Sequence, residues 1–157
     1  MSISRTLFLP DAAATDRLGA ILAAKLGRGD TVLLSGDIGT GKTHLARAII
    51  QTMAATRGLP LIDVPSPTFT LVQTYAFTDI EVWHADLYRL SDPGELFELG
   101  LDDALEDAIV LIEWPDRLGL ARPDALSMSF TVKDDGRNCV ITSQSDRWQD
   151  ILDCADA

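Results

Sequence analysis

The fold is decided by one stretch of the chain, Gly36-Asp37-Ile38-Gly39-Thr40-Gly41-Lys42-Thr43, which matches the phosphate-binding pattern G-x-x-x-x-G-K-S/T. Its glycines let consecutive backbone N–H groups curve around phosphate oxygens without a side-chain clash. In such a loop Lys42 reaches the β- and γ-phosphates, and the Thr43 hydroxyl is a ligand for Mg²⁺. The plainer alternative is a glycine-rich turn with an exposed lysine.

The segments on either side of the loop have the character that the pattern requires. Thr31–Ser35 is a compact apolar run that predicts a buried strand, and His44–Arg57 predicts a helix that Gly58 ends. A phosphate loop lies between such a strand and such a helix, so that the positive end of the helix faces the anion. This context favours a nucleotide-binding loop over a simple turn.

The rest of the chain alternates predicted strands and helices. The predicted strands are Arg5–Leu9, Phe69–Phe77, Glu81–Ala85, Ala108–Glu113, Ala125–Lys133 and Arg137–Ser143, the last two being a hairpin around Asp134-Asp135-Gly136. The predicted helices are Ala12–Leu26, Pro93–Leu105 with an interruption at Gly100, and Asp146–Cys154. We expect a single domain over residues 1–157, a three-layer α/β P-loop NTPase-like domain with a central β-sheet that is mixed at its edges.

A magnesium–nucleotide site needs an acid beside the loop, and two acids end predicted strands. Glu113 ends the most apolar strand, and Asp86 follows the strand that contains His84. Both acids fall at the carboxyl edge of a parallel sheet, where open α/β folds bind ligands. One would hold Mg²⁺ while the other orients or deprotonates the attacking water. Either acid alone is also typical of a helix cap or a solvated strand end.

Three neighbouring features have both a functional and a structural interpretation. His84 shares a strand face with Asp86, and we expect it to be packed and hydrogen-bonded rather than catalytic. Ser66-Pro67-Thr68-Phe69 lies where P-loop proteins carry nucleotide-sensing loops, although alone it predicts only a turn. For Trp114 we favour packing or a partner contact over adenine stacking.

Charge and composition exclude several classes of protein. Thirteen Lys and Arg against 24 Asp and Glu give a formal net charge of −11, which argues against a broad surface that grips nucleic acid. No apolar run approaches the roughly 18 residues of a membrane span. Cys139 and Cys154 form neither a metal-binding nor a disulfide pattern, so we expect reduced thiols in a cytoplasmic protein.

Five blocks of sequence, in their order along the chain, resemble the TsaE family (also called YjeE), small bacterial ATPases needed to make threonylcarbamoyladenosine in tRNA. They are LPD at Leu9–Asp11, GDIGTGKT, SPTFTLVQTY at Ser66–Tyr75, HADLYRL at His84–Leu90 and IEWPDRL at Ile112–Leu118. The loop is common to many NTPases, whereas the SPTFTLV, HADLYRL and EWP blocks are specific. The resemblance extends from about Leu7 to Arg137 and is not weakened by Ile38 and Thr40, where the family often has Leu and Ala.

The resemblance implies an activity and partners. Members of the family bind ATP and Mg²⁺, hydrolyse ATP slowly when alone, and act on a complex of TsaB and TsaD. In that complex TsaD transfers the threonylcarbamoyl group to adenosine 37 of tRNAs that read codons beginning with A. ATP hydrolysis would drive or reset the complex. The chain would contact tRNA only indirectly, through that complex, and no membrane partner is expected.

The resemblance also implies roles for individual residues. The Mg²⁺ ligands would be Thr43 and Glu113, and the catalytic residues would be Lys42 and Asp86. Nucleotide contacts are expected from Asp11, Asp37, Ile38, Gly39, Thr40, Gly41, Lys42, Thr43 and Arg137. Arg137 has the alternative of pairing only with Asp134 or Asp135.

Two other functions stay open on the sequence. The first is a small P-loop kinase, although such kinases usually carry an arginine-rich lid and Arg89, Arg117 and Arg122 are scattered here. The second is a nucleotide-dependent binding module without turnover. Transfer of phosphate to a metabolite with no partner present would favour the kinase, and phosphate release that stays at background with the partner complex would favour the module.

Overall fold

The strands form one seven-stranded sheet in the order β1-β7-β6-β2-β5-β4-β3, in a computed structural model that describes residues 2–92, 94–118 and 122–155. The strands are β1 (Ile3–Leu9), β2 (Thr31–Gly36), β3 (Val72–Ala76), β4 (Glu81–Asp86), β5 (Ile109–Glu113), β6 (Leu126–Lys133) and β7 (Gly136–Ser143). The central strands β6, β2, β5 and β4 are parallel, whereas β1, β7 and β3 pair in the antiparallel sense. The predicted sheet, mixed at its edges, is confirmed.

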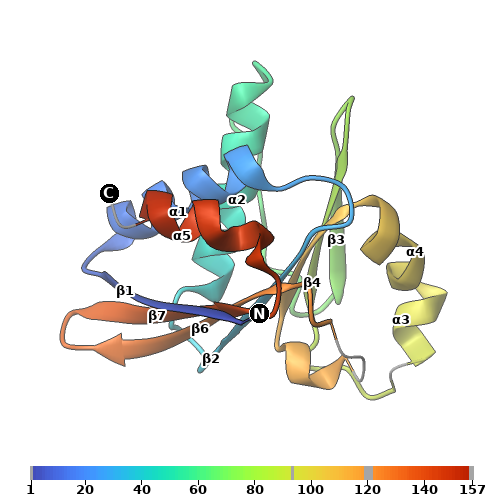
Figure 1. The fold of residues 1–157 in the computed structure, drawn as a ribbon. Helices are drawn as coiled ribbons and strands as arrows, with labels where there is room; N and C mark the ends of the chain where they lie inside the picture. The colour runs from blue at the N-terminus through green and yellow to red at the C-terminus, as the bar shows by residue number, and fades with distance from the viewer. Residues whose placement is uncertain (1, 93, 119–121, 156–157) are drawn as a thin grey trace.

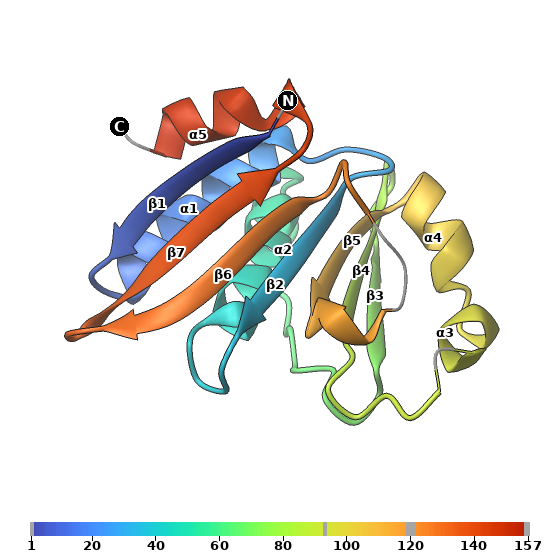
Figure 2. The same cartoon turned by 60° about the horizontal axis from the view of Figure 1, so that its bottom comes forward.

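Helices cover both faces of the sheet (Figures 1 and 2). On one face lie α1 (Ala12–Lys25), α2 (Lys42–Thr56) and α5 (Gln149–Ala155), and against the other lie α3 (Gly94–Glu98) and α4 (Leu101–Asp107). Single 3₁₀ turns, η1 (Pro115–Arg117) and η2 (Asp146–Trp148), follow β5 and β7. The three-layer α/β architecture is therefore present as expected.

The all-apolar sequence of β5 results from burial on both of its faces. Ile109 and Leu111 belong to the core under α1, α2 and α5, whereas Val110 and Ile112 belong to the core under α3 and α4. A parallel strand that is covered on both sides has no solvent face, so its hydrophobic run is continuous rather than alternating. Glu113 ends this strand and is itself buried, with 2% of its surface exposed.

The predicted strand Phe69–Phe77 is too long. The observed strand β3 begins only at Val72, because the preceding residues form a turn in which the Leu71 N–H donates to the Pro67 carbonyl at 2.8 Å. Leu71 also adopts a φ of 67°, a left-handed conformation that strand geometry excludes. The first part of the predicted strand is therefore a loop at the carboxyl edge of the sheet.

Two predicted helices differ from the structure at their ends. In the segment Pro93–Leu105 the predicted interruption at Gly100 is confirmed, because α3 and α4 separate there, where φ is 86°. The helix α4 runs on past the predicted end to Asp107, and Pro93 itself lies outside the described residues. The segment Asp146–Cys154 begins as the 3₁₀ turn η2 before α5 starts. The other predicted elements match within two residues at each end.

Two expectations on composition can be set beside the fold. Within the described ranges, no helix has the length and apolar character to cross a bilayer. Cys139 on β7 is a free, fully buried thiol, and burial raises its pKa to about 12. That pKa keeps Cys139 in the unreactive thiol form. The side chain of Cys154 lies outside the described residues.

Candidate functional site

The phosphate loop connects the end of β2 to the start of α2 at the carboxyl edge of the parallel strands (Figure 2). Gly41 is the residue before α2, with a φ of 109°, and no described side chain caps this helix end. The N–H groups of a first helical turn have no partner inside the helix, so they are available to an anion. The backbone N–H groups at this helix end are therefore available for the expected phosphate cradle.

Glycine at position 36 lets the start of the loop pack closely against the neighbouring strand β6. A Cβ on Gly36, whose φ is 140°, would lie 2.6 Å from the Phe130 carbonyl oxygen of β6. The buried Thr40 donates from Oγ1 to the Asp37 carbonyl at 2.8 Å and so closes the turn from within. The Thr40 hydroxyl thus stabilises the loop, a structural role that the sequence did not indicate.

Lys42 occupies the centre of the site. Its Nζ donates to the Gly36 carbonyl at 2.5 Å and lies 3.5 Å from the centre of the Trp114 ring. Burial lowers the pKa of Lys42, and the nearby carboxylates, of which Glu113 and Asp86 act most strongly, oppose that shift. A single buried cation is thus held among acids at the point where negatively charged phosphates would enter.

Glu113 joins the loop to the sheet core. Its Oε1 and Oε2 accept from the Thr43 hydroxyl at 2.8 and 3.0 Å, and its Oε2 lies 2.7 Å from the Nε2 of His84. His84 and Glu113 have 0% and 2% of their side chains exposed. The two residues expected to hold Mg²⁺, Thr43 and Glu113, are therefore in direct contact. His84 is packed and hydrogen-bonded, as expected.

Asp86 lies directly beside Glu113, because β4 and β5 are parallel and these two residues are in register. Asp86 Oδ2 accepts from the Thr68 hydroxyl at 3.1 Å, and Thr68 in turn contacts the Ser66 hydroxyl at 2.8 Å. The Oδ1 of Asp86 accepts from the Tyr88 N–H at 3.0 Å. The Ser66–Phe69 segment is therefore a turn that contacts the second acid of the site.

Trp114 packs within the site. Its backbone is left-handed, with φ 59° and ψ 54°, which turns the chain sharply after β5 and brings the ring over Lys42. The Tyr88 ring lies 4.8 Å away, centre to centre. Of the interpretations considered for Trp114, the observed contacts are those of packing.

A cavity of about 480 Å³ lies over these side chains. Its lining includes Lys42, Thr43, Thr68, Asp86, Glu113 and Trp114. Within the described part of the chain, no cluster of three or more His, Cys, Asp or Glu side chains could hold a metal. A Mg²⁺ ion on a nucleotide needs no such cluster, since it takes most of its ligands from water and phosphates. The Thr43 hydroxyl and the Glu113 carboxylate fit that requirement.

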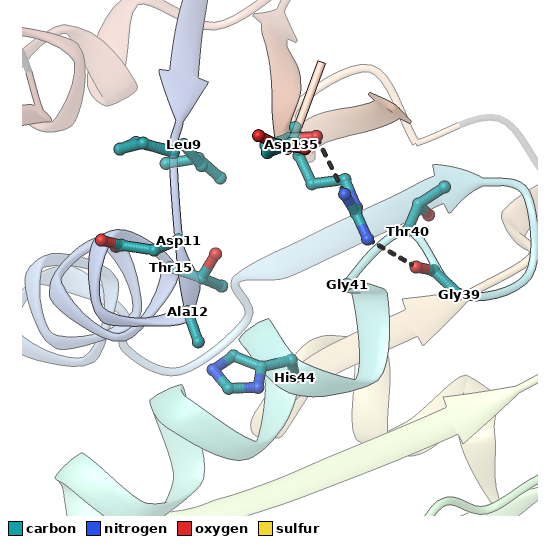
Figure 3. Close-up of a pocket in the computed structure, with 12 residues that line it drawn as sticks. Leu9, Asp11, Ala12, Thr15, Gly39, Thr40, Gly41, His44 and Asp135 are labelled. Atoms are coloured by element: carbon teal, nitrogen blue, oxygen red, sulfur yellow. Dashed lines mark hydrogen bonds between the residues drawn. The ribbon is translucent and has the colours of Figure 1, made fainter. Parts of the chain in front are cut away.

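A second cavity, of about 210 Å³, adjoins the other side of the loop (Figure 3). It shares Gly39, Gly41 and His44 with the first cavity, and Asp11 and Arg137 also line it. Asp11 caps α1 by accepting from the Ala14 N–H at 2.9 Å. The structure therefore places the two outlying predicted nucleotide contacts together, beside the phosphate loop.

Arg137 contacts the phosphate loop directly. Its Nη2 donates to the Gly39 carbonyl at 3.3 Å and its Nη1 to the Gly136 carbonyl at 2.9 Å (Figure 3). These contacts differ from the alternative pairing with Asp134 or Asp135. Of the other predicted loop contacts, Ile38 is 76% exposed and lies at the mouth of the larger cavity.

Sequence reasoning missed several residues at the rim of the site. Arg89 lines the larger cavity and lies 4.5 Å from the centre of the Phe69 ring, and Arg117 lies 5.8 Å from the centre of the Tyr88 ring. His44 Nε2, at the start of α2, lies 2.8 Å from Asp16 Oδ1. The hydrogen bond from the Tyr88 N–H to Asp86 had a local signal in the sequence, because an Asp side chain often accepts from the N–H two residues later.

The sequence matches the family model described as threonylcarbamoyl adenosine biosynthesis protein TsaE over residues 9–139. The TsaE protein of Rickettsia felis is 36% identical over 143 residues, which cover 89% of this chain and 81% of that protein. The TsaE protein of Haemophilus influenzae is 35% identical over 156 residues, covering 95% and 96% of the two chains. Both relatives are named tRNA threonylcarbamoyladenosine biosynthesis protein TsaE.

A solved structure has the same fold. Bacillus subtilis YdiB superposes with a TM-score of 0.75 at 23% identity, and the match covers 99% of this chain and 96% of that one. This likeness supports the α/β P-loop architecture.

Proposed function

The chain belongs to the TsaE family of tRNA threonylcarbamoyladenosine biosynthesis proteins, and from that premise we propose that it is a Mg²⁺-dependent ATP hydrolase that works as one domain over residues 1–157. The observation that carries the proposal is the meeting of the phosphate loop with two acids. Thr43 on α2 bonds Glu113 at 2.8 Å, and Asp86 stands beside Glu113 in the parallel register of β4 and β5. A simple turn with a lysine has no need of this arrangement.

The two cavities match the two ends of a nucleotide. The larger cavity contains the cation of Lys42, the Thr43 hydroxyl and both acids, so we assign it to the β- and γ-phosphates. The smaller one, between Asp11 and Arg137, is assigned to the nucleoside end. The preference for ATP over GTP rests on membership of the family.

Each polar side chain has a role that follows from its chemistry. Lys42 neutralises phosphate charge as it develops, because a buried cation acts more strongly than one in water. Thr43 and Glu113 would hold Mg²⁺, which when bound offsets negative charge on the β- and γ-phosphates. Without a metal, the summed formal charge of the four residues Lys42, Glu113, Asp86 and Asp37 is negative. A divalent cation would therefore reduce the repulsion between these acids and the phosphates.

Asp86 is assigned to the water. Its carboxylate orients a water molecule and accepts a proton from it as the water oxygen bonds to the γ-phosphorus and the bond to the β–γ bridging oxygen breaks. The products are ADP and inorganic phosphate. Because Asp86 is held by Thr68 on the Ser66–Phe69 turn, a partner that moves this turn would change the rate of hydrolysis.

The proposed partners are TsaB-like and TsaD-like proteins, and ATP hydrolysis would drive or reset their complex as it modifies adenosine 37 of tRNA. The net charge of −11 fits contact with proteins rather than with a tRNA backbone. We propose that the chain works in the cytoplasm, because a role in tRNA modification requires access to tRNA. The transferase chemistry would belong to another chain.

The test is phosphate release from Mg²⁺-ATP, measured with and without the TsaB- and TsaD-like proteins of the same organism. We expect slow release alone, a clear rise with the partners, and background release for Lys42→Ala under both conditions. Release that stays at background when the partners are added would contradict the proposal. A parallel screen for phosphate transfer to small metabolites covers the kinase, and robust transfer without partners would replace the ATPase assignment.

A further inference from the structure

His84 is buried at the back of the site, where no proposed step uses it. It lies on β4, two residues before Asp86, and its ring is completely buried. Burying a polar ring is unfavourable unless its nitrogens are hydrogen-bonded. An apolar residue would fill this place in the core at lower cost, so the contacts that His84 makes deserve a functional explanation.

Among the described residues, the side chain of His84 makes one hydrogen bond, and it reaches the proposed metal ligand. His84 Nε2 lies 2.7 Å from Glu113 Oε2, and a carboxylate oxygen accepts, so Nε2 carries the hydrogen. The other ring nitrogen, Nδ1, is buried and has no hydrogen-bond partner among the described residues. A hydrogen on Nδ1 would be buried without an acceptor, which favours the tautomer with the hydrogen on Nε2.

The contact fixes Glu113 and, through it, the orientation of the Thr43 hydroxyl. Thr43 donates its only hydrogen to Glu113, at 2.8 Å from Oε1, which leaves both lone pairs of its oxygen free for the cavity. Those lone pairs are what a cation on the phosphates would use. A Glu113 side chain free to rotate would let the hydroxyl turn its hydrogen toward the cavity.

We infer that His84 is a positioning residue that holds the Glu113 carboxylate through its Nε2–H and thereby sets the Mg²⁺ affinity of the nucleotide site. The inference rests on the proposed function, because it assigns the metal to Thr43 and Glu113. Partners that hold metal ligands in place commonly change metal affinity by about 10- to 100-fold when they are removed.

Two length-matched variants separate positioning from packing. His84→Met fills a similar volume and has no hydrogen-bond donor, whereas His84→Gln keeps an N–H group at the position of Nε2. The measurement is binding of a fluorescent, non-hydrolysable ATP analogue, titrated with Mg²⁺. For His84→Met we expect about tenfold weaker apparent Mg²⁺ affinity with unchanged binding of the metal-free analogue, and for His84→Gln we expect affinity close to wild type.

The outcomes distinguish this inference from the proposed function. If the wild type and His84→Met show the same apparent Mg²⁺ affinity, the inference is overturned and the ATPase proposal still stands. Absence of any Mg²⁺ effect in the wild type would contradict both. Loss of metal-free binding in both variants would mean that His84 serves packing alone, which also overturns the inference.

A spectroscopic measurement tests the hydrogen bond even if a variant folds poorly. The chain has two histidines, so ¹⁵N-histidine NMR of the wild type gives two ring systems, and His44→Gln assigns them. We expect the His84 ring to show a protonated Nε2 and a bare Nδ1 in slow exchange with water. A His84 ring with its hydrogen on Nδ1 would overturn the inference.

Discussion

The two acids of the site stand side by side on neighbouring strands, yet different parts of the molecule hold them. Glu113 is bonded by Thr43 in the first turn of α2 and by His84 within β4. Asp86 is bonded by Thr68 in a loop turn and by the N–H of Tyr88 just after its strand. The exposed fractions, 2% and 4%, do not distinguish them.

The difference lies in how firmly each acid is fixed. Both partners of Glu113 belong to regular elements packed in the core, whereas both partners of Asp86 belong to connecting segments, which are generally the more mobile and adaptable parts of a fold. A fixed carboxylate suits a metal site, which needs constant geometry. A carboxylate held by a loop suits a step that a partner protein switches on. The comparison therefore supports the proposed roles, with Mg²⁺ at Glu113 and hydrolysis at Asp86.

The largest effect is expected from removing the Lys42 cation, which faces both acids. Lys42→Ala should lower partner-stimulated phosphate release by about 100-fold or more, as loss of a preorganised charge at the reacting group does. Both carboxylates would then face the phosphates without compensation. Lys25→Ala, on the exposed end of α1, is the matched control and should behave as wild type. Wild-type turnover in Lys42→Ala would refute the role of the loop.

The next variant isolates the acid that the loop holds. Asp86→Asn keeps the size of the side chain and removes its charge, so hydrolysis should fall about 100-fold or more while binding of Mg²⁺-ATP is kept. Binding by calorimetry and phosphate release are measured on the same sample. If binding collapses along with turnover, Asp86 is a metal ligand or a structural residue, and the assigned roles are exchanged.

The third variant isolates the acid that the core holds. Glu113→Gln should weaken Mg²⁺-ATP binding by about 10- to 100-fold and should leave binding of metal-free ATP nearly unchanged. The two affinities are compared in buffer with Mg²⁺ and in buffer with a chelator. Equal losses under the two conditions would argue against a metal ligand at this position.

The smallest expected effect tests the loop contact itself. Thr68→Val removes the hydroxyl that donates to Asp86 with little change in shape, so turnover should fall by roughly fivefold, the equivalent of about 1 kcal/mol. Nucleotide binding should be unchanged. Thr70→Val is a control in the same turn, because its hydroxyl accepts from Gln73 instead of donating to an acid. Equal turnover in the two variants would show that the Thr68 contact has no role.

The sequence predicted the parts of the site that depend on local pattern. The loop between a buried strand and a helix, the acid that ends the apolar strand and the cap at Asp11 all follow from residue types at short spacing. The mixed sheet also followed, because β5 is apolar throughout and the hairpin of β6 and β7 has its own turn signal. Nothing beyond elementary packing was needed for these predictions.

The remaining features depend on contacts between distant segments. The register that sets Asp86 beside Glu113 is fixed by the pairing of β4 with β5, and no local pattern encodes it. The left-handed backbone at Leu71, with a φ of 67°, ended a predicted strand early. The contacts of Arg89 with the Phe69 ring and of Arg117 with the Tyr88 ring also join segments that are distant in the sequence.

The division of roles between the two acids is tested most directly by a crystal structure with a non-hydrolysable ATP analogue and Mn²⁺ in place of Mg²⁺. Anomalous scattering locates the Mn²⁺ ion without reference to the surrounding model. The account predicts that Mn²⁺ lies against the Thr43 hydroxyl on the Glu113 side of the phosphates, with Asp86 facing the γ-phosphate and no metal on its carboxylate. A metal ion bound to Asp86 instead of the Thr43–Glu113 pair would contradict it.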